Sequence, residues 1–169
     1  LGRSHDVHRV LDLTTGLAID AVHMSLLGFE VVSLERNADL FFLLNEAQKK
    51  SRRPEIKKIQ FKNIEAMEGL KEANSFDALY FDPMYPHKKK SALPRKEMQV
   101  FRELVGPDND AEQVFQQCLL TKVLRIVVKR SGDARFWEAL EGNFQKRPIV
   151  FEGKSVRYDV YLKKKEMRP

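Results

Sequence analysis

The fold is decided by residues 76–87, which read FDALYFDPMYPH. Residues 78–81 are apolar without alternation, which is typical of a strand that is covered on both faces. Pro83 cannot continue a ladder of hydrogen bonds, so Asp82 stands where the strand leaves the sheet. An acid, a proline and then the aromatic Tyr85 could accept hydrogen bonds from an amino group and stack on a planar ring. The alternative is a plain strand-to-loop turn, because Asp-Pro commonly opens turns.

The composition indicates one globular domain with a polyanionic partner. A chain of 169 residues can bury a real core, and 43% of its residues are apolar and 32% charged. The net charge of +6 favours a nucleic acid, although modest basicity also serves solubility. The single cysteine, Cys118, excludes an internal disulfide. With no long apolar run and no signal-peptide pattern, we expect a cytoplasmic protein that does not use a membrane.

The first forty residues read as the start of a nucleotide-binding unit. Residues 9–13 predict a buried strand, Gly16 lies in a turn, and apolar residues at helical spacing follow from Leu17 to Gly28. A second strand at 31–35 ends on Glu35, 19 positions after Gly16. An acid about 20 residues after a glycine turn is placed to bind ribose hydroxyls.

The rest of the chain predicts a doubly wound α/β sheet that closes with an antiparallel pair of strands. Further strands are expected at 56–61, 78–81, 123–128, 148–151 and 156–161. Helices are expected at 40–47, 64–71 and 136–140, after the capping-box pattern of Asp110 and Gln113, and along Met98, Phe101 and Val105. Ligands bind at the carboxyl edge of such sheets. The polar residues at this edge are Asp12, Glu35, Asn63 and Asp82.

A basic segment follows directly after Asp82. It contains His87, Lys88, Lys89, Lys90 and Arg95. These residues could neutralise phosphates and orient a nucleic acid, or they could form a solvated surface loop. No second histidine or cysteine lies near His87 in the sequence, so we expect no metal site.

Several of these motifs resemble one enzyme family. The residues are DLTTGLAID at 12–20, LERN at 34–37, DPMYPHKKKSAL at 82–93, KEM at 96–98, LVGPD at 104–108, VVKR at 127–130 and RYDVY at 157–161. They are similar to RsmJ, a family of S-adenosylmethionine-dependent methyltransferases. These enzymes methylate the exocyclic N2 of one guanine in small-subunit (16S) ribosomal RNA. The resemblance covers nearly the whole chain.

The resemblance implies a Rossmann-like class I methyltransferase with a mainly parallel, seven-stranded sheet and a terminal antiparallel β pair. Residues 1–169 would form its single catalytic domain, and the family usually carries a further N-terminal region. The implied cofactor is S-adenosylmethionine, and the implied partner is ribosomal RNA or the small ribosomal subunit. The implied catalytic residues are Asp82, Pro83 and Tyr85. The implied cofactor-binding residues are Asp12, Gly16, Ile19, Asp20, Glu35, Arg36, Lys62, Asn63 and Asp82. The implied RNA-binding residues are His87, Lys88, Lys89, Lys90, Arg95, Lys129 and Arg130.

The chain departs from the family pattern at the glycine turn. The family usually reads Gly-Leu-Gly-Arg-Asp, whereas this chain has Ala18 and Ile19 in the third and fourth positions. Ala18 adds a methyl group and cannot cheaply adopt a positive φ, and Ile19 removes a cation. Lys62 and Asn63 stand where the family usually has small hydroxyl residues. These departures could weaken the cofactor site or alter its shape. We expect Ala18 to be tolerated, because Asp20, Glu35, Asn63 and Asp82 are all present.

Two other functions fit the same residues. One is an amino-methyltransferase that acts on adenine N6 in RNA or DNA, since the Asp82 corner also suits that chemistry. The other is a catalytically silent RNA-binding protein that has lost cofactor binding at the turn. A dehydrogenase is disfavoured because residues 16–21 lack the three-glycine pattern. The sequence does not indicate the oligomeric state.

Overall fold

The computed structural model describes residues 7–84, 105–135, 137–139, 144–154 and 156–164. Within these residues seven strands form one sheet in the order β3-β2-β1-β4-β5-β7-β6. The strands are β1 (Arg9–Asp12), β2 (Glu30–Leu34), β3 (Gln60–Lys62), β4 (Ala78–Phe81), β5 (Arg125–Ser131), β6 (Ile149–Glu152) and β7 (Val156–Leu162). The first five are parallel, and β7 is antiparallel to both β5 and β6. This arrangement confirms the predicted mainly parallel sheet with an antiparallel end.

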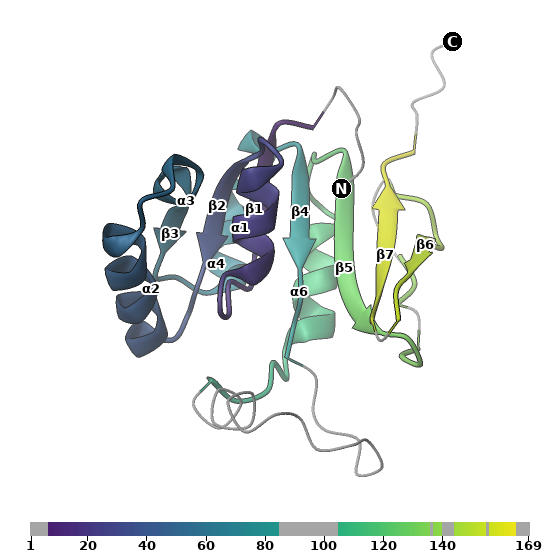
Figure 1. The fold of residues 1–169 in the computed structure, drawn as a ribbon. Coiled ribbons are helices and arrows are strands. Elements are labelled where there is room, and N and C mark those ends of the chain that lie inside the picture. Colours follow the sequence, from purple (N-terminus) through teal and green to yellow (C-terminus); the bar gives the residue numbers. More distant parts are fainter. Residues whose placement is uncertain (1–6, 85–104, 136, 140–143, 155, 165–169) are drawn as a thin grey trace.

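Helices cover both faces of the sheet (Figure 1). They are α1 (Ile19–Leu26), α2 (Ala38–Lys50), α3 (Pro54–Lys58), α4 (Ala66–Gly69), the 3-10 helix η1 (Leu70–Ser75) and α6 (Ala111–Cys118). Ala21 and Met24 of α1 pack in one core cluster with the sheet residues Val10, Val31 and Tyr80. On the opposite face, Phe115 and Cys118 of α6 pack in a second cluster with Leu11, Leu79 and Ile126. The sheet is therefore buried on both sides, as the continuous apolar strands predict.

The connection between β1 and β4 determines where a ligand can bind. The chain passes from β1 outward to β2 and β3, and then returns to place β4 on the other side of β1. This reversal opens a crevice at the carboxyl ends of the strands, which is the usual ligand site of open α/β sheets. In Figure 1 these ends lie at the lower edge of the sheet, where the arrowheads of β2 and β4 point. Glu35 and Asp82 directly follow β2 and β4.

The structure corrects the prediction around Pro54. The sequence-based third strand was expected from Ile56, but residues 54–58 form α3, and β3 begins at Gln60. Proline suits the first turn of a helix because it has no N–H to leave unpaired there and its φ is already helical. Pro54 therefore begins a helix instead of simply interrupting the chain.

Two further predictions concern the segments around α6. Asp110 is the N-cap residue of α6, but its side chain makes no capping hydrogen bond and instead lies 3.8 Å from the guanidinium of Arg36. The expected capping box is therefore absent. Residues 137–139 are not helical, and the other residues of the helix predicted at 136–140 lie outside the described residues. Of the predicted helix 98–105, only Val105 is described.

None of the helices in the described part of the chain has the length and apolar character that a membrane crossing requires.

Candidate functional site

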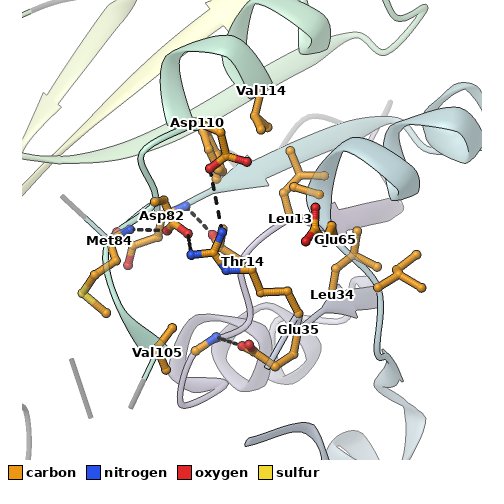
Figure 2. A pocket seen from close by; sticks show the side chains of 16 residues that line it. Leu13, Thr14, Leu34, Glu35, Glu65, Asp82, Met84, Val105, Asp110 and Val114 are labelled. Carbon is orange, nitrogen blue, oxygen red and sulfur yellow. Dashed lines mark hydrogen bonds and ion pairs between the residues drawn. The ribbon is translucent and has the colours of Figure 1, made fainter. Parts of the chain in front are cut away.

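A cleft with an empty volume of about 600 Å³, partly open to solvent, lies at the carboxyl ends of β1, β2 and β4. Its polar lining residues are Thr14, Gly16, Glu35, Arg36, Glu65, Asp82, Asp108 and Asp110. Its apolar lining residues include Leu13, Leu34, Ile64, Phe81 and Val114. Figure 2 shows Asp82 and Met84 on one side of the cleft and Leu34 and Glu65 on the other.

The turn after β1 forms part of the cleft and has an unusual backbone. Gly16 has φ 52° and Ala18 has φ 58°, so both are left-handed. The N–H of Ala18 donates to the carbonyl of Thr15, and the Ala18 carbonyl accepts from Val22 in the first turn of α1. A left-handed alanine costs roughly 1–2 kcal/mol. Its methyl group is 4% exposed and packs in the core cluster beneath α1, and this burial offsets part of the strain.

Asp12 is a buried acid that holds this turn. One carboxylate oxygen accepts from the backbone N–H of Thr14 at 3.2 Å, and the other accepts from the Ser33 hydroxyl at 2.5 Å. Burial raises the pKa of Asp12 to about 7, against these two hydrogen bonds. Asp12 is not among the described residues that line the cleft. It therefore acts on the cleft through the position of the turn.

Glu35 reaches from the end of β2 to the same turn. Its carboxylate accepts from the backbone N–H of Gly16 at 3.1 Å and from that of Asn37 at 2.8 Å. The residue is 4% exposed, and burial raises its pKa while the two N–H groups oppose the rise. A carboxylate can accept about four hydrogen bonds. Glu35 can therefore accept further hydrogen bonds from a pair of hydroxyl groups in the cleft.

Asp108 joins both ends of the segment that follows β4. Its carboxylate accepts from the backbone N–H of Met84 at 2.6 Å, and its own N–H donates to the Met84 carbonyl at 2.9 Å. The guanidinium of Arg36 lies 2.8 Å from the other oxygen of Asp108 and also donates to the Pro107 carbonyl. These contacts fix one wall of the cleft to the end of β2.

Asp82 is held from the α1 face of the sheet. Its backbone N–H donates to the Thr14 hydroxyl at 2.8 Å, which ties it to the turn after β1. Its carboxylate lies 2.9 Å from the ammonium of Lys129, which also lies 2.7 Å from the carboxylate of Asp20. The Tyr80 hydroxyl donates to Asp20 at 2.9 Å. Asp82 therefore belongs to a chain of charged and polar groups.

Several predicted site residues meet at the cleft and others do not. Gly16, Glu35, Arg36 and Asp82 line it. Ile19 is 58% exposed and lies outside it. The Lys62 ammonium pairs with Glu72 on the surface. The Asn63 amide donates to the backbone carbonyls of Glu35 and Arg36, so Asn63 supports these residues from outside the lining.

The two cations at the end of β5, Lys129 and Arg130, make contacts within the described part of the chain. Lys129 pairs with Asp20 and Asp82, as described above. Arg130 is 6% exposed, lies 4.0 Å over the ring of Trp137, and donates to the carbonyl of Arg135. Arg130 is therefore buried among the described residues, and its predicted role in binding RNA phosphates stays a prediction.

The remaining predictions fall partly outside the described residues. Pro83 is described and buried beside Asp82. Tyr85, His87, Lys88, Lys89, Lys90 and Arg95 lie outside the described residues. Among the residues that are described, no three His, Cys, Asp or Glu side chains gather as a metal site would require.

Sequence reasoning missed the partners of Asp82 and of Arg36. Phe81 and Val128 are paired in the parallel ladder of β4 and β5, so Asp82 and Lys129 are the next residues on adjacent strands. That register was the missing information, because the sequence alone does not show which strands are neighbours. The acids Asp108 and Asp110 gave no local signal of their contact with Arg36, more than seventy positions earlier.

An α/β sheet with this strand order and an acid after each of β2 and β4 defines a class I methyltransferase fold. A family model described as "Putative SAM-dependent methyltransferase" matches residues 2–163. The chain therefore belongs to that family of S-adenosylmethionine-dependent methyltransferases.

Individual relatives agree with this assignment. The chain is 44% identical over 165 residues to the ribosomal RNA small subunit methyltransferase J of Bdellovibrio bacteriovorus, and 40% identical over 168 residues to that of Coxiella burnetii. Each match covers 96% of this chain and 63% of the relative, so the chain spans less than two thirds of their length. The crystal structure of a SAM-dependent methyltransferase from Neisseria gonorrhoeae superposes with a TM-score of 0.66 at 26% identity. That match covers 92% of this chain and 65% of the other.

The cleft fits the cofactor of this family in two respects. Glu35 offers acceptors for ribose hydroxyls beside the backbone of Gly16. Leu34, Ile64 and Val114 give an apolar wall suited to a flat ring.

Proposed function

We propose that this chain transfers a methyl group from S-adenosylmethionine to the exocyclic N2 amine of a guanine in small-subunit ribosomal RNA. One observation carries the proposal: Asp82, at the end of β4, lines the same cleft as Glu35, the ribose-type acid at the end of β2. The names of the relatives at 40–44% identity support the substrate class.

The residues divide the work between binding and transfer. When bound, S-adenosylmethionine would supply an electrophilic methyl group for the amine nitrogen, and the cationic methylated amine would release its extra proton to water. Glu35 accepts hydrogen bonds from the ribose hydroxyls and so orients the donor. Asp82 accepts an N–H of the substrate amine, and this contact strengthens as the nitrogen becomes positive. Positioning and electrostatics are then sufficient, without a strong base.

The substrate side of the proposal uses residues beside Asp82 in the chain. The Pro83 carbonyl accepts a second amine hydrogen, and Tyr85 stacks on a guanine that is turned out of its helix. His87, Lys88, Lys89, Lys90 and Arg95 contact RNA phosphates. We propose ribosomal RNA or the small subunit as the partner and the bacterial cytoplasm as the location.

The test is methyl transfer from labelled cofactor to naked 16S ribosomal RNA and to small subunits, followed by mass spectrometry of the nucleosides. We expect N2-methylguanosine with at least one of the two substrates. If only N6-methyladenosine appears, the guanine assignment is wrong and the adenine alternative replaces it. If the chain binds no cofactor at millimolar concentration but retains RNA, it is a silent RNA-binding protein.

A further inference from the structure

The ammonium of Lys129 lies between two carboxylates that come from different elements. Its Nζ is 2.7 Å from Oδ2 of Asp20 in α1 and 2.9 Å from Oδ2 of Asp82 after β4. The Lys129 side chain is 22% exposed, so this contact is partly shielded from water. The same Asp20 oxygen accepts from the Tyr80 hydroxyl. Lys129 thus connects α1, the end of β4 and β5 at one point.

This contact leaves the two oxygens of Asp82 in different situations. Oδ2 is held by Lys129. Among the described residues, none is hydrogen-bonded or ion-paired to Oδ1, while Asp82 lines the cleft. A carboxylate that is fixed through one oxygen has a defined orientation for the other. Oδ1 is therefore the acceptor that a substrate amine would meet.

The charge of Asp82 also depends on Lys129, because other acids surround it. Burial raises the pKa of Asp82, Lys129 opposes that rise, and the neighbouring Asp20 and Asp108 reinforce it. Among the described residues, the buried Asp12 and the Tyr80 hydroxyl also interact electrostatically with Asp20 and Asp82. Although partial burial disfavours the charge of Lys129, the carboxylates of Asp82 and Asp20 raise its pKa. Without the ammonium, two neighbouring carboxylates would share a proton.

We propose that Lys129 is a positioning residue for methyl transfer: it holds Asp82 ionised and turned so that Oδ1 meets the substrate amine. This inference rests on the proposed function, since it assigns the amine contact to Asp82. It differs from the sequence-based role of Lys129 in RNA binding. In the present assignment Lys129 acts through Asp82 and does not contact RNA.

The first experiment needs no cofactor and no RNA. Carbon-13 NMR would follow the titration of the Asp82 carboxyl in the wild type, in Lys129→Met and in Lys129→Arg, with Asp82→Asn for signal assignment. We expect the Asp82 midpoint to rise by at least one pH unit in Lys129→Met and to stay near the wild type in Lys129→Arg. Lys49→Met is the matched control, because Lys49 pairs with Glu46 on the surface of α2. An unchanged midpoint in folded Lys129→Met overturns the proposal.

The second experiment measures the pH dependence of single-turnover methyl transfer. In Lys129→Met the acid limb should move upward with the Asp82 midpoint, and the rate at pH 7 should fall at least tenfold. The RNA concentration for half-saturation should stay within about twofold. A selective loss of RNA affinity with an unchanged pH profile would instead return Lys129 to RNA binding.

Lys129→Gln keeps the test decisive if Lys129→Met does not fold. Its polar side chain carries no charge, so the Asp82 midpoint should again rise. An unchanged midpoint in this variant also overturns the proposal. If the wild type methylates no RNA while the titrations shift as expected, the proposed reaction fails but the coupling of Lys129 to Asp82 stands.

Discussion

The two acids at the ends of β2 and β4, which both line the cleft, are stabilised in different ways. Glu35, after β2, is held by the backbone N–H groups of Gly16 and Asn37. Asp82, after β4, is held by the ammonium of Lys129. Backbone N–H groups are fixed and uncharged, whereas an ammonium supplies a full balancing charge. A carboxylate is thus held by uncharged backbone N–H groups, a neutral cradle, at Glu35 and by an ion pair at Asp82.

This difference matches the roles proposed for Glu35 in cofactor binding and for Asp82 in methyl transfer. A neutral cradle suits an acid that accepts hydrogen bonds from hydroxyl groups whose charge does not change. An ion pair suits an acid that must remain ionised among Asp20 and Asp108 while positive charge develops beside it. We therefore propose that the β1–β2 side serves binding and the β4–β5 side serves transfer, and the following substitutions test that division.

Asp82→Asn should have the largest effect. It keeps the shape of the side chain but removes the charge that stabilises the developing cation, so the transfer rate should fall about 10²–10³-fold. Affinity for the cofactor should stay within about threefold. Single-turnover methyl transfer at saturating RNA measures the first quantity and calorimetry the second. A nearly native rate would mean that the Asp-Pro-Met-Tyr corner is only a structural turn.

Asp12→Asn should change the pH dependence of stability. The folded pKa of Asp12 is about 7, above its ordinary value of 3.8, so folding takes up a proton between these values. The contribution of Asp12 to the free energy of unfolding should therefore be greatest below about pH 4. This contribution should fall by up to about 1.4 kcal/mol per pH unit as the pH rises towards 7.

Asparagine does not titrate, so this contribution should vanish in Asp12→Asn. Urea unfolding at pH 5 and pH 7.5 gives the free energies of unfolding for the two proteins. Parallel pH profiles for wild type and variant would show that Asp12 is ionised in the folded protein. The β1–β2 side would then hold an ionised buried acid, as the β4–β5 side is proposed to do at Asp82.

Glu35→Gln should weaken binding of the demethylated cofactor, S-adenosylhomocysteine, at least tenfold, which corresponds to about 1.4 kcal/mol. The reason is the loss of charge-assisted hydrogen bonds to ribose. Calorimetry is the measurement, and Glu68→Gln on the exposed surface of α4 is the matched control. The transfer rate at saturating cofactor should change less than threefold. If the transfer rate of Glu35→Gln fell as much as that of Asp82→Asn, Glu35 would take part in transfer as well as in binding, and the proposed division would be wrong.

Ala18→Gly should have the smallest effect. Relief of about 1–2 kcal/mol of left-handed strain is opposed by about 0.8 kcal/mol of lost methyl burial and by the greater freedom of glycine in the unfolded chain. The free energy of unfolding should therefore change by less than about 1 kcal/mol. Ala21→Gly, in the regular part of α1, should lose more because no strain is relieved there. Equal losses in urea unfolding would show that the turn after β1 is unstrained.

The sequence was sufficient to predict the positions of the two central acids. Pro83 ends β4 and so fixes Asp82 at the edge of the sheet, and Glu35 ends a strand at the expected distance from Gly16. Both predictions use local rules about where a strand can continue. The same rules missed α3, because residues 56–61 were interpreted as one strand.

The direction in which a side chain points could not be predicted from these local rules. Lys129 and Arg130 are adjacent in sequence and were given one role, but successive residues of a strand point to opposite faces. Lys129 meets Asp20 on the α1 face, while Arg130 lies over Trp137 in the core beneath α6. Asn63 likewise turns to the backbone of Glu35. Such contacts depend on strand register and on residues distant in sequence.

The two hydrogen bonds between Met84 and Asp108 have a consequence for how the protein can diversify. They bring the chain back to one point after the segment between these residues. The free-energy cost of closing a loop grows only slowly with its length, by about 0.6 kcal/mol for each doubling. A change in length between the two residues therefore costs little in loop closure, while Met84 and Asp108 keep their contacts at the wall of the cleft. The residues proposed to contact RNA phosphates can then differ without a change at Asp82 or Glu35, whereas Tyr85 would have to be kept for stacking on the guanine.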